Sequence, residues 1–186
     1  RIRTTTNLKL GSMQTNSVEV ADASYTGQAA NLRFIATEYI AFTGQPTTLQ
    51  AGSNMLLHSL TNIIMDANVT IDSPLTTILA DANCDDSGLF NVSHQSHVST
   101  TNQKLDFVTH TVVIEGTIST GTARMTSSVC SGKPIDVGGD GSGSADFVLT
   151  QLELQKLTAS NLTIFNDHNI TAYNTAQEDT EKIAGK

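Results

Sequence analysis

One glycine-rich segment gathers the residues of this chain that come nearest to a metal site. Asp136, Asp140 and Asp146 lie among four glycines, and carboxylate oxygens on a flexible backbone are the ligands that calcium prefers. The nonapeptide calcium repeat requires Asp where Gly143 stands, and the EF-hand loop requires an acid where Phe147 stands. We therefore expect a long polar turn, with calcium at the three aspartates as the alternative, and no other metal or cofactor.

Other reactive side chains lack the partners that catalysis requires. His94 and His97 are three residues apart, with no third zinc ligand nearby. Ser142 lies between glycines, but Asp140 and Ser144 occupy the two glycine positions of the G-x-S-x-G nucleophile elbow. These residues predict neither a zinc site nor a serine nucleophile.

The adjacent carboxylates Asp85 and Asp86 could serve a polysaccharide-cleaving groove, because acid pairs perform that chemistry. They follow Cys84 and precede Ser87 and Gly88, a context that is more typical of a solvated turn. We predict a non-catalytic protein with no catalytic residues. The alternative is a polysaccharide lyase or glycoside hydrolase on a parallel β-helix scaffold.

Two kinds of covalent modification are suggested by motif. Cys84 and Cys130 are too few for a disulfide framework and lack zinc spacing, so we expect at most one bridge, either between them or to partner chains. Four N-x-S/T sequons are candidates for glycosylation in a secretory route. They begin at Asn68, Asn91, Asn161 and Asn169. Chance produces such motifs readily in a chain this rich in Asn, Ser and Thr.

Composition excludes several classes of protein. The formal charge of −8 and the scattered Lys and Arg argue against a nucleic-acid surface, and no apolar run is long enough to span a membrane. The first residues lack both Met and the apolar stretch of a signal peptide, so we expect a piece of a larger protein. With 5% aromatic residues and no Trp, the core must consist mainly of aliphatic side chains.

Short runs in which apolar and polar residues alternate are the candidate strands that would position any site. Asn161–Ile164 and Asn31–Phe34 place apolar residues at every second position, which predicts strands with one buried face. Nine residues of this kind are predicted to share one core: Leu32, Phe34, Val69, Ile71, Val112, Ile114, Leu162, Ile164 and Ile170. Runs recur about every seven to ten residues, a spacing that fits a sandwich, a barrel or a solenoid. A helix within Phe147–Leu157 is the alternative to strands there.

The solenoid is favoured because distant segments restate one another. Leu49–Leu57 and Leu157–Ile164 each place a Leu, an Ala and a small polar turn before an Asn that opens a strand. Thr-x-Thr motifs occur at Thr4, Thr109 and Thr120, but they do not repeat at one interval, so an ice-binding lattice is not predicted.

The segment Leu149–Ile164 resembles a coil of large secreted adhesins of the filamentous-haemagglutinin type, in which an LT..EL..L.A..L.I pattern recurs. Thr47–Gly52 and Val69–Leu75 are similar to coils of the same family. The resemblance implies an all-β, right-handed parallel β-solenoid with short strands and about twenty residues per coil, hence about nine coils and a rod of about 40 Å. Phe165–His168 departs from the glycine-rich turn of that pattern.

We expect residues 1–176 to form the solenoid and residues 177–186 a polar tail or linker. Strand-like sequence begins almost at once, at Leu8, without a capping element, and natural proteins protect such an edge. The expected function is therefore a structural or adhesive segment of an extracellular fibrous protein that stacks head-to-tail. Its expected partners are other copies, adjoining domains, surface glycans or a receptor.

Overall fold

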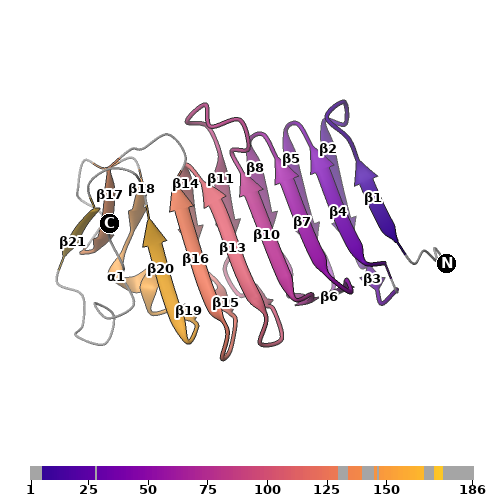
Figure 1. The fold of residues 1–186 in the computed structure, drawn as a ribbon. Coiled ribbons are helices and arrows are strands. Elements are labelled where there is room, and N and C mark those ends of the chain that lie inside the picture. Colours follow the sequence, from indigo (N-terminus) through magenta and orange to yellow (C-terminus); the bar gives the residue numbers. More distant parts are fainter. Residues whose placement is uncertain are drawn as a thin grey trace.

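In the computed structural model the chain is an all-β solenoid of about five turns with about 23 residues per turn. The structure describes residues 6–27, 29–129, 134–139, 145, 147–165 and 170–173, with the backbone alone for residues 165 and 170–173. Successive turns add parallel strands to three sheets, and the strands of each sheet follow one another along the rod axis (Figure 1). The predicted fold class, a parallel β-solenoid with short strands, is confirmed.

The three long sheets are named here by their number of strands. The seven-stranded sheet contains β1 (Asn7–Gly11), β4 (Asn31–Ala36), β7 (Asn54–Ser59), β10 (Leu75–Ala80), β13 (Lys104–Thr109), β16 (Arg124–Val129) and β20 (Asn161–Phe165). The five-stranded sheet contains β2 (Ser17–Ala21), β5 (Tyr39–Thr43), β8 (Asn62–Met65), β11 (Leu89–Val92) and β14 (Thr111–Ile114). The six-stranded sheet contains β3 (Ser24–Tyr25), β6 (Thr47–Gln50), β9 (Val69–Asp72), β12 (His97–Ser99), β15 (Thr117–Ser119) and β19 (Leu157–Thr158).

A shorter sheet and one helix complete the described elements. The three-stranded sheet contains β17 (Ile135–Gly138), β18 (Phe147–Leu149) and β21 (Ile170–Tyr173), and the helix is α1 (Gln151–Leu154). Thr150 caps α1, because its hydroxyl accepts from the Glu153 N–H while the Glu153 carboxylate accepts from the Thr150 N–H. The predicted strand Phe147–Leu149 is β18, and the helix that the sequence offered as the alternative within Phe147–Leu157 is present at these four residues.

The turns are longer and fewer than predicted. Asn7 pairs with Asn31 and Asn31 with Asn54, so the first two turns lie close to the average of about 23 residues. Later turns of the same sheet vary more, because Asn54 pairs with Leu75 but Leu75 pairs with Lys104. The expected nine coils and the rod length derived from them are wrong, because loops between the sheets lengthen some turns and the three-stranded sheet and α1 occupy the last one. Seven rungs of one sheet span only about 29 Å.

The core lies between the sheets and is formed by alternate residues of every strand. Eight of the nine predicted core residues, from Leu32 to Ile164, are at most 3% exposed and belong to one apolar cluster. The ninth, Ile170, pairs with Ile135 in the three-stranded sheet, and its side chain lies outside the described residues. Two aromatic pairs, Phe34 with Phe42 and Phe90 with Phe107, bridge the seven- and five-stranded sheets inside this core.

The corners between sheets fix the direction of the chain. At the first corner Gly11 has a φ of +79°, and a Cβ placed there would lie 2.0 Å from the carbonyl oxygen of Ile35. Further along the same corner the buried hydroxyls of Ser59 and Thr109 donate to the carbonyl oxygens of Glu38 and Gly88 in the preceding turns. These bonds join successive turns where the strand ladders are interrupted.

Candidate interaction surfaces

Within the described part of the chain, no further strand covers the edges of the three sheets at the end of the solenoid that begins with β1. Among the described residues β1, β2 and β3 each have a strand neighbour on one side only. Leu8, Leu10 and Val18 point towards the core but are only half-buried. Their partners one turn further along, Leu32, Phe34 and Ile40, are at most 2% exposed. This end therefore presents both main-chain hydrogen-bonding groups and apolar side chains.

Towards the other end the edge of the five-stranded sheet is covered by side chains. β14 is its last strand, and the N–H of Ile114 donates to Glu153 Oε1 at 3.0 Å. The carbonyl oxygen of Ile114 accepts from Lys156 Nζ at 2.7 Å. Glu153 lies in α1 and Lys156 follows it. Buried main-chain groups need such partners, and Glu153 and Lys156 supply them for Ile114 at an edge beside which β18 also lies.

The outward face of the six-stranded sheet carries at least one hydroxyl on every strand. The strand register aligns six residues of irregular sequence spacing into a single row: Ser24, Thr48, Thr70, Ser99, Ser119 and Thr158. Adjacent members are about 4.8 Å apart. The Thr-x-Thr motif at Thr109–Thr111 does not belong to this row, since Thr109 is buried and bonds to carbonyl oxygens. A regular hydroxyl row thus exists where the sequence showed no fixed interval.

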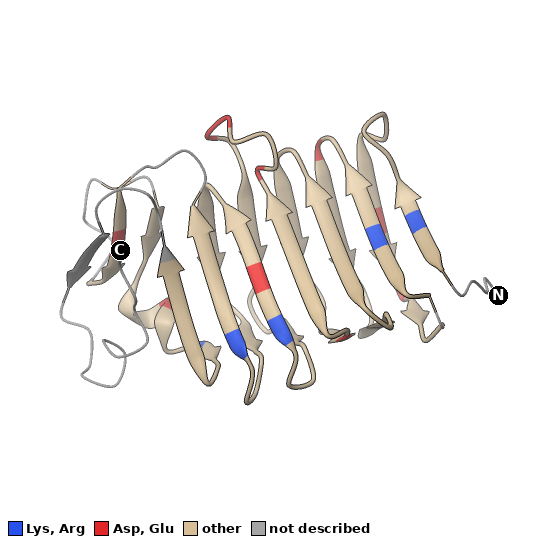
Figure 2. Ribbon diagram, viewed as in Figure 1, with Lys and Arg blue, Asp and Glu red and all other residues tan. Residues whose placement is uncertain are grey.

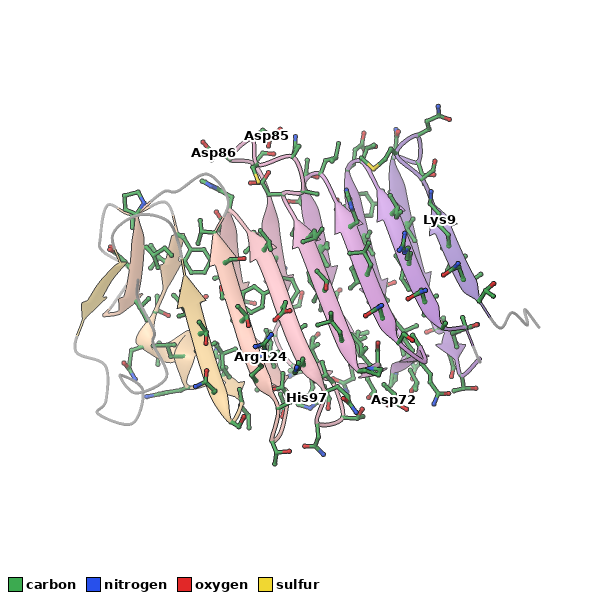
Figure 3. The ribbon with its side chains drawn as sticks, viewed as in Figure 1. Lys9, Asp72, Asp85, Asp86, His97 and Arg124 are labelled. Atoms are coloured by element: carbon green, nitrogen blue, oxygen red, sulfur yellow. The ribbon has the colours of Figure 1, made fainter. Side chains whose placement is uncertain are left out.

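The paired carboxylates lie in the loop that joins β10 to β11, above the rod in Figure 3. Asp85 accepts hydrogen bonds from Ser87 and Asn83, which lower the pKa of its carboxyl group. Asp81 is buried, which raises the pKa of its carboxyl group, and its Oδ1 accepts from the Asp85 N–H. Asp86 faces His110, with 3.6 Å between Oδ1 and Nδ1. The loop is thus bonded mainly within itself, as a polar turn would be.

Cys84 belongs to this same loop and is disulfide-bonded. Cys130 lies outside the described residues. An oxidised cysteine is consistent with the predicted bridge, whose partner the sequence left open.

The three described sequon asparagines lie on different parts of the rod. Asn68 is exposed and its Oδ1 accepts from the His97 N–H. Asn91 lies half-buried in β11, and Asn161 opens β20, where its Oδ1 accepts from the hydroxyl of Thr163. Asn169 lies outside the described residues. Asn68 and Asn161 are the exposed members of this set.

The calcium alternative rests mostly on undescribed residues. Asp136 is 6% exposed in β17, and Asp140, Ser142 and Asp146 lie outside the described part of the chain. His94 lies exposed in a turn, whereas the ring of His97 contacts the hydroxyl of Thr117 at 2.6 Å. Within the described ranges no three His, Cys, Asp or Glu side chains are grouped as a metal site requires, and no described helix could span a membrane.

Comparisons of this chain with protein-family models, with curated proteins and with solved structures find no match.

Proposed function

We propose that this chain is a non-catalytic structural segment of an extracellular fibrous or adhesive protein, and that it extends into a rod by head-to-tail stacking. The observation that supports this most directly is the end formed by β1, β2 and β3. Each sheet there offers an edge to which another parallel strand can add. The half-buried Leu8, Leu10 and Val18 would become buried under a further turn, as Leu32, Phe34 and Ile40 already are.

The strand edges at the two ends suit the head-to-tail arrangement. The seven-stranded sheet runs from β1 to β20 and the six-stranded sheet from β3 to β19, with every pairing parallel. In a stack, β1 and β3 of one copy would meet β20 and β19 of the next, and these two parallel ladders would continue, whereas β2 would face the edge at which Glu153 and Lys156 bond to Ile114. Such a heterologous contact leaves an end for the next copy, whereas a two-fold contact closes a dimer.

The disulfide at Cys84 supports the extracellular part of the proposal. Disulfides persist in oxidising compartments and are rare in reducing ones. The exposed sequons at Asn68 and Asn161 are compatible with passage through a secretory route, where glycans are attached.

Sedimentation velocity over a wide range of concentration, with electron micrographs of the same samples, tests the stacking. We expect concentration-dependent rods from the unmodified chain, and Leu10→Lys and Val18→Lys should suppress them because each places a charge in the contact. Leu56→Lys is the matched control, since Leu56 lies half-buried on the outward face of β7 in mid-rod. A folded monomer that dilution does not change, at every concentration, would refute the stacking.

A further inference from the structure

Positive charge is concentrated on one face of this acidic protein. The described residues include five Lys or Arg, and four of them lie exposed on the outward face of the seven-stranded sheet: Lys9, Arg33, Lys104 and Arg124. Asp106 is the one carboxylate among the described residues of that face (Figure 2). The face thus carries a net charge of +3 on a chain whose formal charge is −8.

The four cations form two pairs of like charge on neighbouring strands. Lys9 of β1 lies opposite Arg33 of β4. Lys104 of β13 and Arg124 of β16 directly precede the partners Leu105 and Met125. Like charges on adjacent rungs, about 4.8 Å apart, destabilise a sheet. None of the four forms an ion pair with a described carboxylate, so within the described chain this repulsion is not offset by a direct contact.

We propose that this outward face binds an extended acidic polysaccharide. Arg33 and Lys104 are separated by three strand steps, about 14 Å along the rod. One small anion cannot reach both pairs, whereas a polymer with repeated carboxylates or sulfates contacts both at once and gains affinity from the linkage. Lys9 and Arg124, at the two outer limits of the positive face, lie on the same side of the rod (Figure 3).

The polar groups on the face, and the absence of certain others, favour a polysaccharide over other polyanions. Asn54 and Thr77 lie on the strands between the two pairs, Asn31 and Thr126 lie on the strands of Arg33 and Arg124, and all four can bond to sugar hydroxyls. From β1 to β16 no Phe, Tyr or Trp is found among its described side chains, so this part of the face lacks the stacking platform that single-stranded nucleic acids use. The strands between β1 and β20 are paired on both sides, which excludes a peptide that binds there by strand addition.

The polysaccharide inference rests on the extracellular placement proposed above, where such polymers occur. It does not depend on stacking, because the cations lie along the rod and not only at its end. The stacking assay contains no polysaccharide, so the two proposals fail separately.

Binding is tested by calorimetry and surface plasmon resonance with heparin as the sulfated probe and polygalacturonate as the uronate probe. We expect binding that weakens as salt rises. The double neutralisations Lys9→Gln with Arg33→Gln, and Lys104→Gln with Arg124→Gln, should each lower affinity by at least about fivefold. Thr48→Glu with Ser99→Glu on the six-stranded sheet changes the net charge by the same two units and should lower affinity by less than about twofold.

All four cations are exposed, so we expect the neutralised variants to fold, and their thermal unfolding serves as the check. Absence of binding to both probes by the unmodified chain would overturn the inference. An equal loss in the Thr48 and Ser99 control would also overturn it, because the effect would then follow net charge and not this face. Displacement by duplex DNA as effective as by heparin would overturn the assignment to polysaccharide.

Discussion

Lys156 Nζ lies 2.7 Å from the carbonyl oxygen of Ile114, at the outer edge of the last strand of the five-stranded sheet. Glu153 bonds to the N–H of the same residue. Two side chains therefore bond to the main-chain N–H and carbonyl of one buried residue on the outer edge of this strand.

Removing either side chain should destabilise the fold. Lys156→Met leaves the Ile114 carbonyl without its donor and should cost about 1 kcal/mol, and Glu153→Ala, which also removes the capping box of α1, should cost about 2 kcal/mol. Urea denaturation measures both values. Leu152→Ala is the control in the same helix, because Leu152 is 70% exposed, and it should change stability by less than about 0.5 kcal/mol. Equal effects of all three changes would contradict the edge contact.

The alternation of inward and outward residues predicts different costs at adjacent positions. Phe107 is 1% exposed and its ring packs 5.4 Å from that of Phe90, whereas Val108 points outward and is half-buried. Phe107→Ala should cost about 3–5 kcal/mol and Val108→Ala about 1 kcal/mol. The shift in denaturation midpoint of each variant measures its loss of stability. A greater loss from Val108→Ala than from Phe107→Ala would mean that the register is wrong.

His58 should make stability depend on pH. Burial lowers the pKa of His58 from its ordinary value of 6.5, and no hydrogen bond to its Nε2 occurs among the described residues. The unfolded chain therefore takes up a proton at higher pH than the folded chain, so stability should fall as pH drops below 6.5, towards the folded pKa. His58→Leu, placed between Ile35 and Leu79 of the neighbouring strands, should remove this part of the dependence.

Urea midpoints at about pH 7.5 and about pH 5 measure the effect for both proteins. We expect the advantage of His58→Leu over the unmodified chain to be greater at the lower pH. Midpoint curves that stay parallel across this range would contradict the prediction.

Cys84 is disulfide-bonded, and the chain contains one other cysteine. We predict that Cys84 pairs with Cys130, so the denatured, unreduced monomer should contain no titratable thiol. Reduction, or Cys84→Ser together with Cys130→Ser, should lower stability by about 2–5 kcal/mol because the unfolded chain gains conformations. Peptide mapping by mass spectrometry identifies the linked peptides, and a bridge between two chains would contradict the pairing.

The strands that the sequence predicts well are those with two or more buried apolar residues. In β4 and β7 the alternation continues for several positions, and the inward residues are buried as expected. By contrast β12 and β15 have three residues each, with only Val98 and Ile118 buried. One apolar residue between polar ones has no detectable period. These strands exist because neighbouring turns supply their hydrogen-bonding partners.

The sequence contains a local signal for the helix α1, but the shortness of the helix argues against it. Thr150 and Glu153 have the spacing of a capping box, but a helix this short is marginal in isolation. Its contacts with Ile114 lie far away in the sequence, so no local pattern indicates them.

The cationic face could not be read from sequence spacing. Two other strands separate Lys9 from Arg33 along the chain, and two separate Lys104 from Arg124. A long stretch that contains carboxylates and no Lys or Arg lies between the two pairs. Only the strand register brings all four cations to one side. The overall negative charge argues against a broad basic surface, but a net charge does not reveal a local cluster of cations.

Leu75 keeps its register with Asn54 on one side and with Lys104 on the other, although the first of these turns is shorter than the average and the second is longer. The loop from Asp81 to Gly88 takes up much of the difference outside the sheets (Figure 1). A rod built in this way accepts added sequence at its corners without altering its interior. It can therefore serve as a display scaffold, in which peptides grafted at successive corners are presented in order along one line while the supporting framework stays the same.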